Sequence, residues 1–430
     1  MPRLFARHAA VRVLALLPAF LLASCGNNTG AVITVPNSVV VSDLKGDGVL
    51  DIVLASAQID ETGLTQKPGL LGVILNSTSS PGTFSGIVDY ASSSSPPSGL
   101  AVGDLTGTGS HDLVVANLNA GTLSVFKETS ATSGTYGAPQ TITVGGQPND
   151  VQIVDINGDG LPDLVIADNT GAVKYLLQNP ASPGTFQAGV SLAISNPAIV
   201  ANDGATFATR GISVAVGDLN GDGLPDIAVT SFDANGDFGL VFIFFQDPNN
   251  HGSFIATPTT ITTLGEPSQI RIADVNKDGS NDIVIACQGQ GSLSAQVAAE
   301  ATQGAMVILQ NSGTPGTFAT PVVYPATYAG TLSVALGDLN GDGYLDIAMA
   351  GLYPTGSGQI VTLMQNPAAP GTFLAATDYT GLGQPASIVI GDMNNDGLPD
   401  LVTADATSAV WYKNQASAPG TFVSQGQVGL

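Results

Sequence analysis

The residues best suited to chemistry lie in one short loop of the sequence that contains a glycine at its sixth position, Gly223. Oxygen-bearing side chains stand at its positions one, three, five and nine: Asp218, Asn220, Asp222 and Asp226. A hard cation such as Ca²⁺ takes roughly six to eight oxygen ligands, and a backbone carbonyl at position seven, that of Leu224, adds to the set. Glycine adopts the left-handed backbone that such a turn needs at little steric cost. The spacing therefore predicts a calcium-type loop.

The flanks of this loop predict strands rather than helices. An EF-hand would place Glu at position twelve, where this chain has Val229. The segments on either side, Ile212–Val216 and Ile227–Thr230, are short apolar runs rich in β-branched residues, typical of buried strands. We expect the loop at the tip of a β-hairpin.

The loop recurs seven times, about every 58 residues. Its first residue is Asp43, Asp104, Asp155, Asp218, Asp274, Asp338 or Asp392. A second motif follows each copy in phase; its full form is Pro-Gly-Thr-Phe, as in Pro183–Phe186, and its variants include Gly134–Tyr136 and Gly252–Phe254. Two motifs that repeat in phase indicate seven copies of one structural unit.

Five copies carry the complete ligand pattern, and we expect about five calcium ions. The expected ligands, including the carbonyl of position seven, are Asp155, Asn157, Asp159, Leu161 and Asp163; Asp218, Asn220, Asp222, Leu224 and Asp226; Asp274, Asn276, Asp278, Ser280 and Asp282; Asp338, Asn340, Asp342, Tyr344 and Asp346; and Asp392, Asn394, Asp396, Leu398 and Asp400.

The other two copies depart from this pattern. The first has Lys45 at position three, which predicts weak binding by Asp43, Asp47 and Asp51. The second has Thr106 and Thr108 at positions three and five, and we interpret it as a turn without metal.

The charge of the chain supports cation sites rather than nucleic-acid binding. The net charge is −23, and 20 of the 34 acidic residues lie in the seven loops. Binding to phosphates needs basic clusters, which are missing, so a nucleic-acid partner is excluded. Each ligand set comes from one tight loop, whereas a catalytic metal needs an open position aimed at substrate. We therefore expect the metal to be structural and name no catalytic residue.

Each unit divides into four short strands. In the third unit these are Val151–Val154, Leu164–Ala167, Ala172–Leu177 and a strand beginning at Thr185. The apolar runs are continuous, which predicts burial on both faces. Seven such units predict an all-β, seven-bladed propeller of four-stranded blades, with the calcium-type loops between strands one and two. Residues 421–430 are expected as the outer strand of blade seven, with Ala31–Val35 as an alternative clasp on that edge.

The N-terminus predicts export. Residues 1–24 combine arginines with a short apolar run, and Leu22–Cys25 resembles the lipobox of a bacterial lipoprotein precursor. This resemblance implies an acylated Cys25, a linker over residues 25–36 and a propeller over 37–430, anchored at the outer membrane or cell surface. An ordinary cleaved signal peptide is the alternative. The second cysteine, Cys287, is expected in the core.

The repeated Gly-Asp-x-Asn-Gly-Asp-Gly-x-x-Asp-Ile pattern and the Gly-x-Phe segment after it resemble FG-GAP/VCBS repeats, which are similar to the N-terminal propeller of integrin α subunits. The resemblance covers residues 37–424 and implies a monomeric binding or adhesion module for a protein or glycan ligand. A carbohydrate-active enzyme, similar to a polysaccharide lyase or a glycosidase, and a structural partner in envelope assembly are the alternatives. Because loops of varying length expand between strands two and three and between blades, we expect ligand contacts from residues there: Phe207, Arg210, Phe232, Phe238 and Tyr353.

Overall fold

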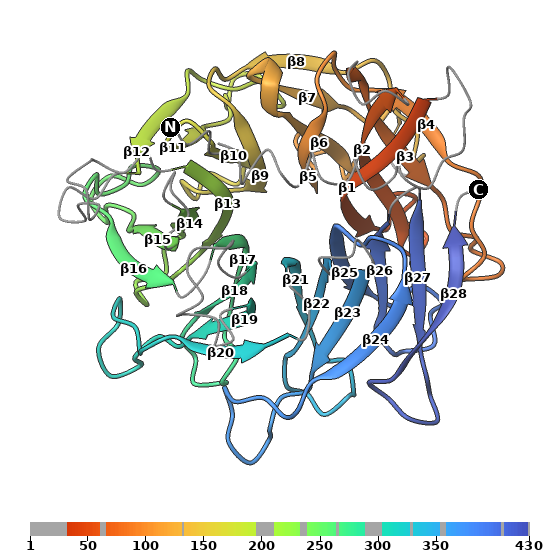
Figure 1. Ribbon diagram of the computed structural model, residues 1–430. Coiled ribbons are helices and arrows are strands. Elements are labelled where there is room, and N and C mark those ends of the chain that lie inside the picture. Colours follow the sequence, from red (N-terminus) through yellow and green to blue (C-terminus); the bar gives the residue numbers. More distant parts are fainter. Residues whose placement is uncertain are drawn as a thin grey trace, which may run out of the picture.

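The structure is a computed structural model that describes most of the chain. The described residues are 32–60, 66–130, 133–194, 210–232, 239–263, 266–288, 303–326, 330–352, 358–405 and 408–428. They form seven four-stranded antiparallel sheets arranged as blades around a central axis (Figure 1). The seven-bladed propeller predicted from the repeats is confirmed.

The blades follow one another along the chain, and the first strand of each is the innermost. Blade 1 contains β1 (Val32–Ser42), β2 (Asp51–Asp60), β3 (Gln66–Ile74) and β4 (Val88–Ala91). Blade 2 contains β5 (Pro97–Gly103), β6 (Asp112–Asn117), the 3-10 turn η1 (Leu118–Ala120), β7 (Thr122–Phe126) and β8 (Gln140–Thr143). Blade 3 contains β9 (Pro148–Val154), β10 (Asp163–Asp168), β11 (Ala172–Leu176) and β12 (Val190–Ala193). Blade 4 contains β13 (Arg210–Gly217), β14 (Asp226–Phe232), β15 (Gly239–Phe244) and β16 (Thr259–Thr263).

The last three blades repeat this order. Blade 5 contains β17 (Pro267–Ala273), β18 (Asp282–Gln288), β19 (Gln303–Ile308) and β20 (Val322–Pro325). Blade 6 contains β21 (Thr331–Gly337), β22 (Asp346–Leu352), β23 (Gly358–Leu363) and β24 (Thr377–Leu382). Blade 7 contains β25 (Ser387–Gly391), β26 (Asp400–Ala404), β27 (Ala409–Asn414) and β28 (Phe422–Val428). No helix among the described residues is long and apolar enough to cross a membrane.

The core consists of seven apolar layers, one between each pair of neighbouring blades. The middle strands supply most of it, and every residue of β6, β10, β15 and β23 is buried. Both faces of such a strand pack against a neighbouring blade. Its residues are therefore apolar in sequence, whereas a strand with one exposed face alternates apolar and polar residues. This agrees with the interpretation of the sequence runs.

The ring closes without exchange of a strand between blades. β28 pairs with β27, so blade 7 is one continuous segment, as predicted. Val32–Pro36 pairs with Ser56–Asp60 inside blade 1, so the alternative clasp on blade 7 is wrong. The first strand begins at Val32, before the propeller boundary expected at residue 37, because the β-branched run Val32-Ile-Thr-Val continues the inner strand.

Closure depends instead on contacts between blades 1 and 7. Asn76 Nδ2 donates to the Met393 carbonyl at 2.7 Å, and Asn395 Nδ2 donates to the Gly48 carbonyl at 3.0 Å. An apolar layer that includes Ile52 and Trp411 fills the same seam.

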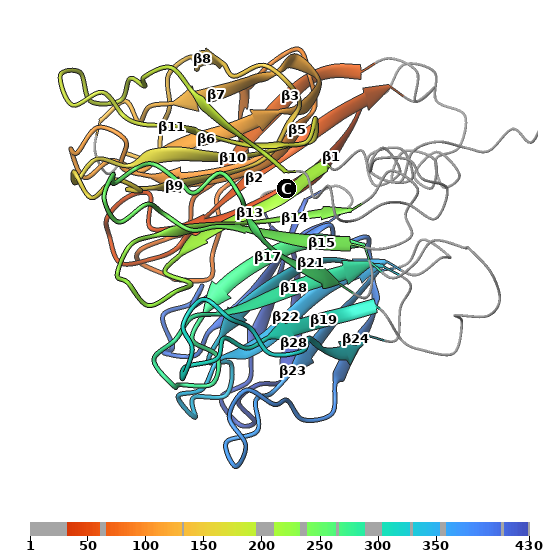
Figure 2. The ribbon, with the colours of Figure 1, turned by 90° about the vertical axis from the view of Figure 1, so that its left-hand side faces the viewer.

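The two faces of the ring differ in their connections (Figure 2). All seven connections between first and second strands contain eight residues, and they share their face with the Pro-Gly-Thr-Phe turns. We call this the motif face. Connections on the opposite face, which we call the variable face, range from 3 residues between β10 and β11 to 16 between β12 and β13.

Candidate calcium loops and the groups that hold them

The first Asp of each loop organises the backbone around it. In the five complete loops its carboxylate accepts the N–H of the glycine at position six at 2.7–2.9 Å. The Asn at position three accepts the N–H of position five at 2.9 Å in all five. The Asp at position five accepts the N–H of position seven at 2.9–3.1 Å. These side chains therefore replace the ladder bonds that the turn lacks.

Two positions of the loop, not one, have a left-handed backbone. Position six is glycine in every copy. At Gly223 φ is 84°, and a Cβ added to Gly223 would meet nothing within 4 Å. Position four is left-handed as well, and its non-glycine members are Lys277 at φ 58° and Asn395 at φ 55°. The left-handed position four was not predicted, although five of the seven copies have glycine there. The turn thus requires glycine through its dihedral angles, not through crowding.

The Asp at position nine has a structural role that the sequence did not predict. Asp226 is fully buried, and its carboxylate accepts the N–H groups of Leu219 and Gln246, both at 2.8 Å. It thereby joins the start of the loop to the end of the third strand. Burial, with a smaller contribution from the charges of Asp222 and Asp218, raises the pKa of Asp226 to about 7, although the two N–H bonds lower it.

The same arrangement holds in all seven blades. The equivalent carboxylates also accept two backbone N–H groups, one from loop position two and one from the end of the third strand: Asp51, Asp112, Asp163, Asp282, Asp346 and Asp400. Burial raises the pKa of five of them to about 6: Asp51, Asp163, Asp282, Asp346 and Asp400.

A buried amide side chain connects the two repeating motifs. Gln246 Nε2 donates to the Pro225 carbonyl of the calcium-type loop at 2.8 Å, and its Oε1 accepts the N–H of Gly252 in the second motif at 2.9 Å. Every blade has a Gln, Asn or Glu six residues before that glycine: Asn76, Glu128, Gln178, Gln246, Gln310, Gln365 and Asn414. This regular spacing was visible in the sequence and was missed.

The glycine of the second motif packs on the loop of the preceding blade. A Cβ on Gly252 would lie 2.8 Å from the Asn157 Cβ, and one on Gly371 would lie 3.0 Å from the Asn276 Cβ. Across the closing seam a Cβ on Gly82 would meet Trp411 at 2.7 Å. These glycines are therefore required by close approach as well as by positive φ.

The two incomplete loops hold themselves together in other ways. In the first, Lys45 Nζ donates to Asp47 Oδ2 and to the Asn76 carbonyl, both at 2.5 Å, so an ammonium group offsets part of the negative charge of the loop. In the second, the hydroxyls of Thr106 and Thr108 bond to each other at 2.8 Å. Burial raises the pKa of Asp104, but hydrogen bonds from Gly109 and Thr108 outweigh it and leave the pKa below its ordinary value.

The chemistry of the donor set fits calcium. The complete loops offer carboxylate, amide and carbonyl oxygens and no nitrogen or sulfur ligand, which is the preference of a hard cation. Each carboxylate has about four lone-pair sites, so those bonded to backbone N–H groups keep acceptor capacity. In the described part of the chain no three Asp, Glu, His or Cys side chains converge on one metal position.

The residues expected to contact a ligand are only partly described. Arg210 and Phe232 are cross-strand partners at one end of β13 and β14, on the variable face. Phe207, Phe238 and Tyr353 lie outside the described residues, as do residues 1–24 and Cys25.

Comparisons with known proteins concern the repeats and the fold. The profile described as FG-GAP-like repeat matches residues 104–166, 155–229, 218–285 and 296–349, together more than half of the chain. A phosphatidylinositol-glycan-specific phospholipase D of Dictyostelium discoideum is 26% identical over 167 residues, which cover 32% of this chain and 17% of that protein. The match thus spans about a sixth of that relative's length.

Among solved structures, a putative 6-phosphogluconolactonase from Bacteroides uniformis ATCC 8492 superposes with a TM-score of 0.53. The alignment covers 92% of this chain and 94% of that one at 13% identity. At this identity the likeness shows the propeller fold alone.

Proposed function

The chain belongs to the FG-GAP-like repeat family, and from this premise we propose that it is a calcium-stabilised binding module for a protein or glycan ligand. The observation that supports this most is the difference between the two faces of the ring. On the motif face the connection between first and second strands has eight residues in every blade, and the connection between third and fourth strands has 13 or 14 residues in blades 1 to 6 and 7 in blade 7. The connections on the variable face range from 3 to 16 residues. Variable loops on a rigid scaffold are where recognition usually resides.

The ends of β13 and β14 on the variable face also have residue types suited to an interface. Arg210 and Phe232 lie opposite each other across β13 and β14. Arginine and aromatic residues are enriched among the side chains that dominate binding energy. A ligand on this face would therefore contact blade 4.

A glycan array, probed in calcium and again in chelator, tests the proposal and supplies a ligand. Arg210→Ala and Phe232→Ala are then compared with Pro315→Ala and Pro370→Ala on the motif face. We expect the first pair to weaken binding by about tenfold or more and the second pair to leave it unchanged. Loss of binding only in the second pair, in folded protein, contradicts the choice of face. Cleavage of a polysaccharide on the array would identify an enzyme instead.

We propose further that calcium occupies the five complete loops, beginning at Asp155, Asp218, Asp274, Asp338 and Asp392. When bound, the ion supplies positive charge that offsets the repulsion among three carboxylates of one loop. The protein's own part is to hold position nine in place through buried N–H bonds, so that only positions one, three and five adjust.

Calcium is expected to raise the melting temperature of demetallated protein. At ~10 mM calcium, a loop with a Kd of roughly 10⁻⁴–10⁻³ M contributes about 1.4–2.7 kcal/mol. Asp222→Ala is expected to reduce the calcium-dependent shift, because it removes a carboxylate at position five. Thr108→Ala, at position five of the second loop, serves as the matched control and should leave the shift intact. Equal melting in calcium and in chelator would refute calcium binding.

We propose that the module is a membrane-anchored lipoprotein exported to the outer membrane or cell surface. The lipobox-like Leu22–Cys25 supports this. Intact-mass analysis is expected to show acylated Cys25 as the first residue, and Cys25→Ser should move the protein from the membrane to the soluble fraction. An unmodified cysteine would contradict the anchor.

A further inference from the structure

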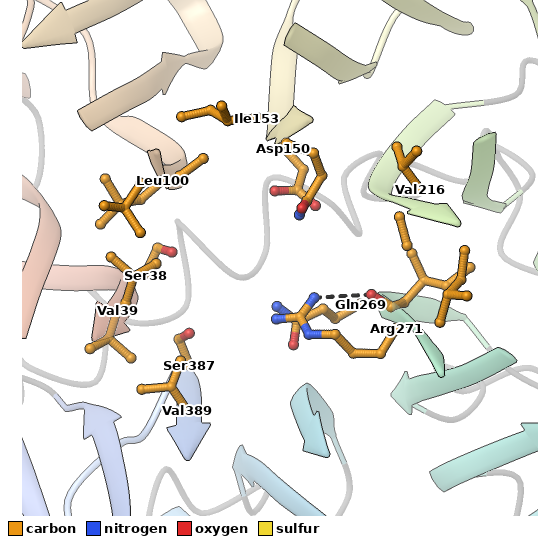
Figure 3. A pocket seen from close by; sticks show the side chains of 17 residues that line it. Ser38, Val39, Leu100, Asp150, Ile153, Val216, Gln269, Arg271, Ser387 and Val389 are labelled. Atoms are coloured by element: carbon orange, nitrogen blue, oxygen red, sulfur yellow. Dashed lines mark hydrogen bonds between the residues drawn. The ribbon is translucent and has the colours of Figure 1, made fainter. Parts of the chain in front are cut away.

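The inner strands enclose a cavity of about 370 Å³ on the axis of the ring. Six of the seven blades contribute to its wall, through β1, β5, β9, β13, β17 and β25 (Figure 3). A smaller hollow of about 120 Å³ adjoins it and shares Ser38, Asp150, Gln269 and Ser387 with it. Small-molecule sites in proteins have volumes of roughly 300–1,000 Å³, so the larger cavity is of sufficient size.

The wall is mostly small and uncharged, with one cation. Arg271 is the fifth residue of β17 and lies near the middle of the inner strand. The corresponding lining residues of other blades are Val40, Ala101, Ala215 and Val389, and of blade 3 Gln152. The repeat therefore does not require a charged residue at this position, and Arg271 is particular to blade 5 among these six blades.

Arg271 forms no ion pair with any residue in the described part of the chain. Its Nη1 donates to the carbonyl of Ile270 at 3.0 Å, and no described carboxylate oxygen lies within ion-pairing distance, 4.0 Å. Figure 3 shows the side chain reaching into the cavity. Burial lowers the pKa of Arg271, and the charge of Asp150 offsets part of this effect. A partly buried guanidinium group without an ion pair has unused donors, and a bound anion would pair with them.

The polar groups around Arg271 are fixed by the neighbouring blades. Asp150 Oδ2 accepts the hydroxyl of Ser213 at 2.6 Å and the N–H of Val214 at 3.1 Å. Gln269 Oε1 accepts the hydroxyl of Ser333 at 2.7 Å. These bonds hold Asp150 and Gln269 as parts of a preformed wall, whereas the remaining N–H groups of Arg271 stay available.

We propose that this axial cavity binds a small hydroxylated carboxylic acid, whose carboxylate pairs with Arg271 and whose hydroxyls bond to Asp150 and Gln152. A guanidinium group matches a carboxylate through two parallel hydrogen bonds. The single cation and the nearby carboxylate of Asp150 favour a monoanion over a phosphate dianion. Asp150 and the Gln152 carbonyl oxygen are acceptors, which selects a ligand with hydroxyl donors. This site is separate from the ligand surface proposed on the variable face.

Binding of D-galacturonate, measured by ligand-detected NMR at saturating calcium, tests this inference. D-galactose is the matched control, because it has the same ring and replaces the carboxylate by a neutral group. We expect galacturonate to bind at least about tenfold more tightly than galactose, as one charge-assisted contact implies. Equal binding of both sugars, or binding of neither, overturns the inference, and this comparison depends on no variant.

Variants then locate the site. Arg271→Gln is expected to abolish the preference for galacturonate while the protein stays folded, because it removes the cation without breaking an ion pair within 4.0 Å. Arg271→Lys should retain a weaker preference, and Arg210→Ala on the variable face should leave it unchanged. If Arg271→Gln binds galacturonate as the unaltered protein does, the axial site is refuted, whereas the glycan-array result remains independent.

Discussion

A protein that ends at residue 418 is expected to lose its cooperative fold. The truncation removes β28, whose Phe422 and Val428 are buried in the apolar layers on either side of blade 7. It also removes Gly420, whose N–H bonds to Asn414 Oδ1 at 2.9 Å. Loss of one buried Phe side chain costs about 3–5 kcal/mol, and a domain is stable by only about 5–15 kcal/mol.

Thermal melting followed by circular dichroism measures this effect, with limited proteolysis as a second probe. A protein that ends at Val428 is the control and should melt like the full chain, because all of β28 remains. The single substitution Phe422→Ala should lie between the two. If the chain that ends at residue 418 melts like the control, the outer strand of blade 7 does not close the ring.

Asp226→Ala is expected to destabilise the protein by about 3–5 kcal/mol even in chelator, where calcium plays no part. The substitution leaves the buried N–H groups of Leu219 and Gln246 without an acceptor, and each such group costs about 1–3 kcal/mol. Denaturant unfolding in chelator measures the change. Asp222→Ala should cost only about 1 kcal/mol, because its carboxylate accepts exposed donors, the N–H of Leu224 and the Nδ2 of Asn220, which water can replace.

The equivalent change in the second loop separates structure from metal binding. Asp112 accepts the N–H groups of Leu105 and Glu128 in the same way, although its loop lacks the calcium ligands at positions three and five. Asp112→Ala should therefore destabilise about as strongly as Asp226→Ala and leave the calcium-dependent shift unchanged. If Asp112→Ala leaves the free energy of unfolding unchanged, position nine acts only as a metal ligand.

The architecture was predictable because two motifs repeat in phase. Each eight-residue connection from Asp218 and its equivalents fixes a hairpin, and each Pro-Gly-Thr-Phe turn fixes the approach to an outer strand. The continuous apolar runs then require a neighbour on both faces. A closed ring buries both faces of all seven units, and the structure has this arrangement.

The parts that were missed depend on contacts between distant residues. Gln246 is an ordinary polar residue in the sequence, and its role appears only when the loop before it and the turn after it meet. Lys277 at a left-handed position departs from the glycine pattern, and its ammonium group lies 4.0 Å from the centre of the Tyr344 ring in the next blade. Arg271 gained its significance only once the inner strands formed a common wall.

The packing of each turn glycine on the loop of the preceding blade gives the ring an order of assembly. Gly252 meets Asn157, and Gly371 meets Asn276, so each blade docks on one that the ribosome has already released. One contact runs against this order, because Gly82 of blade 1 meets Trp411 of blade 7. A nascent chain can therefore form an open arc to which blades are added in order. The exposed faces of blade 1 and of the last blade formed are covered only when blade 7 packs against blade 1.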